Sequence, residues 1–497
     1  MAHDQITHGS ARRHGQGMGR DTVVYALAIA IDRILGLLML PVLTRLLSPV
    51  DYGAWSQTGV AAGLLVVAML YAFPTIIVRR YAVVCRHATR LRAFDRLGLL
   101  SLALGLGIGL GVLAVPSWVA RLVYGGAEYG DLVPALFLWA LADAGAEFAL
   151  AWWRTLGRID IVAVALILRS VVRASVAIYF ATSVADSPLA SWFLYYAIIV
   201  VALSGVFIFL SRKTVKETTK PGKNAGYFDW RAHLLEATPL VTIAAATSLG
   251  SSLDRYLLTG WLGLDVLASY ATASSLAAIP FMFHSVLGYT LFPTMSRQWA
   301  SGQHAEAIKL MNQSLLMYLF LSLPVALAMT GMGVWLLPWL TTAHYQIDMA
   351  VFAGLSLSVV SMGVQQILLY GLLLQERGSQ ILRITLISIV MNFTLTVLLV
   401  PSYGTAGAAS AMALANLSLV AWTARVLSSS CSWSFPWQSA RRILFRALLC
   451  ALPLFGVVIL GGRDVGLMLA ITAIIGLIYF VFDLCSKKSL LRHFSFS

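Results

Sequence analysis

Long runs of apolar residues, each about as long as a bilayer-spanning helix, follow one another along almost the whole chain. A helix rises 1.5 Å per residue, so about 20 apolar residues cross the roughly 30 Å hydrocarbon core of a membrane. The sequence therefore predicts an all-α polytopic membrane protein with about fourteen transmembrane helices. We expect these spans at residues 22–43, 57–78, 97–116, 132–153, 161–182, 190–211, 236–257, 266–293, 312–334, 350–374, 381–401, 404–427, 443–461 and 465–484.

The largest polar interruption between these runs is the basic stretch SRKTVKETTKPGKNAGYFDW, from Ser211 to Trp230. Its charge and its Pro221-Gly222 pair are typical of a linker between two lobes. The predicted organisation is a cytoplasmic N-terminal tail (1–21), a first lobe with spans 1 to 6 (22–211), a basic cytoplasmic linker (212–235), a second lobe with spans 7 to 12 (236–427), spans 13 and 14 (428–484) and a cytoplasmic tail (485–497).

A weak internal sequence repeat relates the two predicted lobes. Leu43-Thr44 and Leu47 recur 215 residues later as Leu258-Thr259 and Leu262. Both stretches lie at a turn between helices on the outer side. Transporters are frequently built from such repeats, so this repeat predicts two pseudo-symmetric six-helix lobes followed by two C-terminal helices.

Composition and charge support a membrane protein. Apolar residues make up 59% of the chain and charged residues 11%, against about 25% charged in typical soluble domains. Of 35 Lys and Arg, only Arg45, Arg121, Arg255 and Arg463 lie on the predicted outer side, and three lie within spans. Because short cytoplasmic loops carry the excess of Lys and Arg, both termini are predicted inside. The net charge of +14 is then a topology signal, and no nucleic-acid partner is expected.

The sequence offers little support for an enzyme. Its four cysteines form no CxxC pair, so we expect neither a metal nor a redox site, and no cofactor. No GxxxxGK[ST], HExxH or GxSxG element is present. The predicted outer loops are too short to carry a catalytic domain. A transporter is therefore favoured over a membrane-embedded polymerase or other assembly component.

Four ionisable residues lie inside two neighbouring predicted spans. Asp143 and Glu147 are four residues apart in one span, and Arg169 and Arg173 are four apart in the next. Each pair lies on one helical face. In an antiparallel hairpin, the residue numbers of two positions at equal depth always add up to the same value. This rule matches Glu147 with Arg169 and Asp143 with Arg173. These pairs either lock the two helices together or hold the arginines at a central cavity, with the carboxylates as candidate ion-coupling groups.

Other intramembrane charges are isolated along the sequence. Asp32 and Arg33 lie near the middle of the first span, where Arg33 either lines a cavity or pairs with a neighbouring helix. Arg80 ends the second span and either reaches the interface or contacts an entering phosphate. His284 lies within the eighth span, as a packing residue or as a coupling candidate together with Asp32.

Several segments resemble the polysaccharide repeat-unit flippases, which serve O-antigen and exopolysaccharide biosynthesis and belong to the multidrug/oligosaccharidyl-lipid/polysaccharide exporter superfamily. The pattern LSPxxYG occurs here within LMLPVLTRLLSPVDYGAWSQ, from Leu38 to Gln57. The segments IIVRRYA (76–82), LDRYLLTGWLGLDVLASYATA (253–273) and PSYGTAGAASA (401–411) are also similar to the family. The matches lie in both halves of the chain.

The resemblance implies a flippase of the bacterial inner membrane. Its substrate would be an undecaprenyl-pyrophosphate-linked oligosaccharide that passes a cationic central cavity by alternating access. Polysaccharide polymerase and glycosyltransferases are the expected protein partners, and membrane lipids surround the chain. The related lipid II flippases use arginines in the first two spans, to which Arg33 and Arg80 are the nearest positions here. The alternative is a multidrug or small-solute antiporter of the same superfamily.

Overall fold

The computed structural model describes residues 4–81, 87–183, 189–217, 229–431, 433–459 and 464–485. These residues form the α-helices α1 to α17 and one 3-10 helix, with no strand among them. The chain divides into two compact units. The first comprises residues up to Ser252 together with Thr259–Leu264, and the second comprises Leu253–Leu258 and all residues from Asp265 onward.

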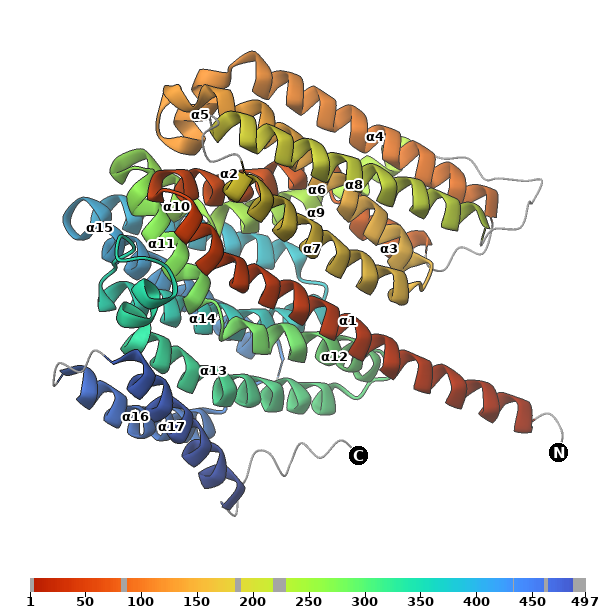
Figure 1. Ribbon diagram of the computed structural model, residues 1–497. Helices are drawn as coiled ribbons and strands as arrows, with labels where there is room; N and C mark the ends of the chain where they lie inside the picture. Colours follow the sequence, from red (N-terminus) through yellow and green to blue (C-terminus); the bar gives the residue numbers. More distant parts are fainter. Residues whose placement is uncertain are drawn as a thin grey trace. The chain divides into compact units, whose positions relative to one another are not determined.

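The first unit is built around α6, which packs against α2, α3, α4, α7 and α8. Small residues let neighbours approach α6 closely, because Ala140, Ala142, Ala149 and Ala151 are fully or almost fully buried. Figure 1 shows the helices of this unit, which are α1 (Asp4–Leu46), α2 (Pro49–Leu70), α3 (Phe73–Tyr81), α4 (His87–Ala114), α5 (Pro116–Tyr124), η1 (Ala127–Leu132), α6 (Val133–Thr155), α7 (Ile159–Ser183), α8 (Leu189–Glu217) and α9 (Trp230–Gly250).

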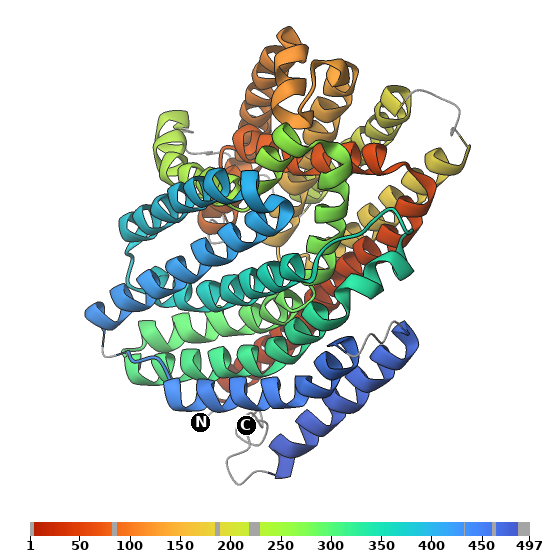
Figure 2. The ribbon, with the colours of Figure 1, turned by 90° about the vertical axis from the view of Figure 1, so that its left-hand side faces the viewer.

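The second unit is a bundle in which α13 packs against α14 and α16, and α14 packs along α15. Figure 2 shows the dark-blue pair α16 and α17 beside the green α13. The buried rings of Tyr318, Phe320 and Tyr479 lie in its core. Its helices are α10 (Leu253–Leu262), through which the boundary between the units runs, α11 (Leu264–Ala277), α12 (Phe281–Ala300), α13 (His304–Leu340), α14 (Met349–Leu374), α15 (Gly378–Ser430), α16 (Trp437–Ile459) and α17 (Val465–Cys485).

The helical, membrane-spanning character predicted from the sequence is confirmed. Ten helices of the described residues are long and apolar enough to cross a bilayer. One of them, α15, covers two predicted spans and is bent at Gly404, whose φ of 53° lies in the left-handed region. The total of about fourteen spans stays a prediction.

Two predicted spans are interrupted in the structure. The run 57–78 is divided between α2 and α3, because Tyr71 and Ala72 take positive φ angles of 46° and 59°. The run 266–293 is divided between α11 and α12 at residues 278–280, where Pro280 directly precedes α12. Continuous hydrophobicity hides both breaks from sequence reasoning, since a membrane helix stays apolar through a turn that protein buries.

One helix groups differently from the predicted lobes. The sequence assigned residues from 236 onward to the second lobe, but α9 packs against α2 and α3 of the first unit. The Tyr71 hydroxyl lies 3.1 Å from Thr238 Oγ1, and the Tyr81 hydroxyl lies 2.8 Å from His233 Nε2. These polar contacts fix α9 to the first half. Residues 218–228 of the predicted linker and the tail after Cys485 lie outside the described residues.

The LSPxxYG pattern forms the start of α2. Ser48 Oγ accepts a hydrogen bond from the Asp51 backbone N–H at 3.1 Å, and Pro49 occupies the first helical turn, where its missing N–H costs nothing. Gly53 lies against the backbone of Leu264, the first residue of α11. The starts of α2 and α11 are 215 residues apart, the same offset as the repeat in the sequence, so the repeat has a structural counterpart at this turn.

Substituting Gly53 tests this close approach. A Cβ at residue 53 would lie 2.1 Å from the Leu264 carbonyl oxygen, so Gly53→Ala should destabilise the protein by about 1–3 kcal/mol through overpacking. We expect a lower melting temperature of the detergent-solubilised protein. Gly63→Ala on the same helix is the control, because nothing lies within 4 Å of its Cβ. Equal melting temperatures for the two variants would contradict the contact.

Candidate functional site

The hairpin of α6 and α7 carries two ion pairs inside the predicted membrane region. Arg169 Nη1 lies 2.8 Å from Glu147 Oε1, and Arg173 pairs with Asp143. The side chains of Arg169 and Arg173 are only 15% and 24% exposed. Both pairings predicted from the equal sums of residue numbers are therefore confirmed. Charges at this depth need such partners, since isolated ones are costly in a bilayer.

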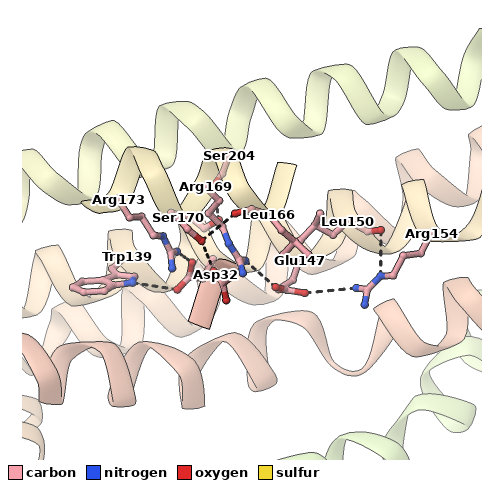
Figure 3. Close-up of polar contacts among 12 residues, drawn as sticks. Asp32, Trp139, Glu147, Leu150, Arg154, Leu166, Arg169, Ser170, Arg173 and Ser204 are labelled. Carbon is pink, nitrogen blue, oxygen red and sulfur yellow. Dashed lines mark hydrogen bonds and ion pairs between the residues drawn. The ribbon is translucent and has the colours of Figure 1, made fainter. Parts of the chain in front are cut away.

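Two residues that the sequence did not single out extend these pairs along α6. Arg154 Nη2 lies 3.6 Å from Glu147 Oε2, so Glu147 faces an arginine on each side. The Trp139 indole N–H donates to Asp143 Oδ2 at 3.1 Å. Figure 3 shows this row from Trp139 to Arg154. Positions 139, 143, 147 and 154 follow the four- and seven-residue spacing of one helical face, which is the signal that would have found them.

The network continues to α1 through Ser170. Its hydroxyl donates to the Asp32 carboxylate and also lies 3.0 Å from the Leu166 carbonyl (Figure 3). Ser170 directly follows Arg169 on α7, and α1 packs along this helix. Asp32 is therefore held to α7 beside Arg169 by one hydroxyl, although none of the described contacts joins its carboxylate to a guanidinium. Because serine is common and uncharged, no pattern in the sequence singles out Ser170.

Arg33 differs from the other arginines of this region. Its side chain is exposed on α1, and it makes no hydrogen bond or ion pair with another described residue. An arginine carries five N–H donors and stays charged at any physiological pH. Together the region holds more arginine than carboxylate, namely Arg33, Arg154, Arg169 and Arg173 against Asp32, Asp143 and Glu147. We call these seven residues the α1–α6–α7 charge network, although Arg33 belongs to it only by its place beside Asp32 on α1 and makes none of the described contacts.

Arg80 lies in a separate polar contact of the first unit. Its Nη1 is 3.7 Å from Glu236 Oε2, which joins α3 to α9. Both side chains are partly exposed, at 49% and 39%. An ion pair of this exposure contributes little to stability, so Arg80 can exchange Glu236 for another anion at low cost. None of the described contacts links Arg80 directly to the charge network.

His284 belongs to the second unit and lies among aromatic rings. It is 7% exposed, stacks on Phe281 and Tyr370 with centroids 5.1 and 6.2 Å apart, and its Nε2 lies 3.5 Å from the Tyr370 hydroxyl. None of the acidic side chains described in the structure is hydrogen-bonded to it. Its surroundings are those of a packing residue, and its role in ion coupling stays a prediction.

Two family models match more than half of the chain each. The model described as polysaccharide biosynthesis protein matches residues 18–299, and the model described as lipid II flippase MurJ matches residues 176–479. The two matched ranges overlap and together cover almost all of the residues that the structure describes.

Individual relatives agree with these families. A probable low-salt glycan biosynthesis flippase, Agl15 of Haloferax volcanii, is 26% identical over 213 residues, which is 43% of this chain and 45% of that protein. The chain thus matches less than half the length of this relative. The fold is similar to lipid II flippase MurJ in an inward closed conformation, with a TM-score of 0.71 at 14% identity over 93% of this chain and 100% of that one.

The multidrug transporter DinF-BH is a more distant structural neighbour, with a TM-score of 0.55 at 13% identity over 86% of this chain and 96% of that one. At such identities these structures show the fold alone. The family models carry the assignment further, because each matches more than half of the chain. The chain belongs to the polysaccharide flippase family of the multidrug/oligosaccharidyl-lipid/polysaccharide exporter superfamily.

Proposed function

We propose that the protein flips undecaprenyl-pyrophosphate-linked oligosaccharide repeat units across the bacterial inner membrane for polysaccharide biosynthesis. The observation that carries this proposal is the α1–α6–α7 charge network, in which three arginines and three carboxylates lie within the predicted spans and a fourth arginine, Arg154, lies just beyond the end of one of them. The excess of positive charge would repel the cationic substrate of a drug exporter, whereas it would attract a pyrophosphate. Both chain termini are proposed to lie in the cytoplasm, as the distribution of Lys and Arg predicts.

The charge network lowers the main energetic barrier to such transport, which is the cost of bringing a charged group into the bilayer. Moving even one charge to the centre of a bilayer costs several kcal/mol or more, and a pyrophosphate carries more than one. Exposed Arg33 offers a guanidinium without a described partner, which can bind a phosphate through two parallel hydrogen bonds. Arg169 and Arg173 are balanced by Glu147 and Asp143, which keep them in place, so the excess positive charge comes from Arg33 and Arg154 against Asp32. Arg80 is proposed as a further phosphate contact.

We further propose that transport proceeds by alternating access through a cationic cavity, with the polyprenyl tail remaining in the lipid. The membrane potential favours outward movement of an anion by about 2.3 kcal/mol per charge per 100 mV. If ions are coupled as well, the candidate groups are Asp32, Asp143, Glu147 and His284. The glycosyltransferases that complete the repeat unit and the polymerase that consumes it are the proposed protein partners.

Replacing Arg33 tests the proposed function directly. In a host from which the gene for this chain is deleted, lipid-linked repeat units should accumulate on the cytoplasmic face. When the Arg33→Ala variant is expressed in that host at normal abundance, export should be at least tenfold lower than with the wild-type protein. Arg121→Ala is the control, because this exposed arginine lies outside the charge network. The measurement is the amount of undecaprenyl-linked glycan on each face of the membrane. Unchanged export together with greater sensitivity to cationic drugs would favour the antiporter instead.

Neutralising one ion pair separates its structural role from a role in transport. Arg173→Gln alone leaves Asp143 without its cation and should cost about 3–5 kcal/mol of stability. Asp143→Asn with Arg173→Gln removes both charges and keeps an acceptor for Trp139, so abundance and melting temperature should return close to the wild type.

We expect export by this double variant to remain at least tenfold below the wild type, because the cation is still missing. The measurement pairs membrane abundance and melting temperature with the same assay of lipid-linked glycan. Normal export by the double variant would mean that the Asp143–Arg173 pair only locks α6 to α7.

A further inference from the structure

The first unit contains an apolar groove that has no part in the charge network. It lies between α4 and α8, with α6 and the end of α2 beneath it, and its volume is about 430 Å³. That volume is within the roughly 300–1,000 Å³ typical of ligand pockets. We call it the α4–α8 groove and define it by Gly98, Leu99 and Leu102 on α4 and Val201, Gly205 and Ile208 on α8. Figure 1 shows these two helices close together.

Glycines shape the groove and leave it open on one side. A Cβ at Gly145 on the groove floor would meet Ile208 at 3.1 Å, whereas a Cβ at Gly205 would meet nothing within 4 Å. Leu99 and Leu102 at the rim are 67% and 45% exposed. The groove is therefore accessible from the surface of the unit, along helices whose exposed residues are predominantly apolar and face lipid if α4 and α8 span the membrane as predicted.

The groove has a cationic end. The face of α8 that carries Val201, Gly205 and Ile208 continues with Arg212 and Lys216, each four residues further on. Arg212 is neutralised by Asp95, which its Nε and Nη2 reach at 2.8 and 3.2 Å.

On α4, Arg92 lies three residues before Asp95 on the same face. Neither Arg92 nor Lys216 makes an ion pair with another described residue. This leaves two cations available at one end of an apolar groove.

The distance from the basic residues to the far end of the groove limits which lipid fits there. Arg92 and Leu102 are ten residues apart on α4, which corresponds to about 15 Å at 1.5 Å per residue. This is half of the roughly 30 Å hydrocarbon core, the depth of a single leaflet. A phospholipid acyl chain matches this depth, whereas the much longer undecaprenyl chain exceeds it. The basic end is the cytoplasmic one by the distribution of Lys and Arg.

We propose that the α4–α8 groove binds an anionic phospholipid of the cytoplasmic leaflet. An acyl chain lies against Leu99, Gly205 and Ile208, and the phosphate lies between Arg92 and Lys216. Basic residues at the membrane surface attract anionic headgroups, and the acyl chain gains van der Waals contacts with the apolar walls. This lipid is a stabilising ligand of the first unit and is distinct from the transported glycolipid, so the inference does not rest on the proposed function.

The test uses the purified full chain in detergent, titrated with phosphatidylglycerol or with phosphatidylcholine. A ligand that binds only the folded state raises the melting temperature, so we expect phosphatidylglycerol to raise it by several degrees and phosphatidylcholine to leave it unchanged. Gly205→Leu fills the groove and should abolish the shift. Gly107→Leu is the matched control, because it is also an exposed helical glycine with nothing within 4 Å and lies outside the groove.

Headgroup selectivity is tested by the double variant Arg92→Gln/Lys216→Gln, in which phosphatidylglycerol should act no better than phosphatidylcholine. An undiminished phosphatidylglycerol shift in Gly205→Leu would overturn the proposal. It would also fall if undecaprenyl phosphate alone raised the melting temperature, since the groove would then hold the transported lipid. Export assays in cells report on the proposed function separately, so the two can fail independently.

Discussion

The need to compensate charges inside a bilayer governs the α6–α7 hairpin of this protein. Arg169 and Arg173 enter the predicted membrane region on α7 only because α6 presents Glu147 and Asp143 in register. The register depends on the tight turn at Gly157, whose φ of 70° lets α7 begin shortly after α6 ends. Stability and charge placement therefore depend on the same hairpin, and any change to its register would leave four charged side chains without their partners.

The compensation also reaches α1, although by a weaker contact. Asp32 is held by the Ser170 hydroxyl and not by a guanidinium. A neutral donor stabilises a carboxylate without cancelling its charge, so Asp32 still exerts an electrostatic effect on its surroundings. Arg33, the next residue along α1, points about 100° away around the helix and stays outside this contact. One pair of adjacent residues thus supplies one anchored anion and one exposed cation.

The sequence predicted the α6–α7 pairs because ion pairing across an antiparallel hairpin depends only on residue numbers and on the position of the turn. It did not predict the grouping of α9, because contacts such as Tyr81 with His233 join residues far apart in the chain and follow no local period. The break at Tyr71 and Ala72 was missed for a related reason, since apolar residues on both sides make the run look continuous. Ser170 acts as a hydrogen-bond donor, and nothing in an apolar helix distinguishes such a serine from a packing residue. Trp139 could have been found only through its four-residue spacing from Asp143.

If the network binds an anion, as the proposed function requires, the way Glu147 is shared allows it to do so while its charges stay paired. Glu147 contacts Arg169 through one carboxylate oxygen and Arg154 through the other. Each guanidinium has five N–H donors, so neither arginine is saturated by half of one carboxylate. In the proposed transport, either arginine could turn toward a phosphate while the other remains with Glu147. The carboxylate then never lacks a partner, and the high cost of leaving an unpaired buried charge is avoided. A simple one-to-one pair could not release its cation without paying that cost, which makes the second arginine on Glu147 the feature that allows the network to be both stable and responsive.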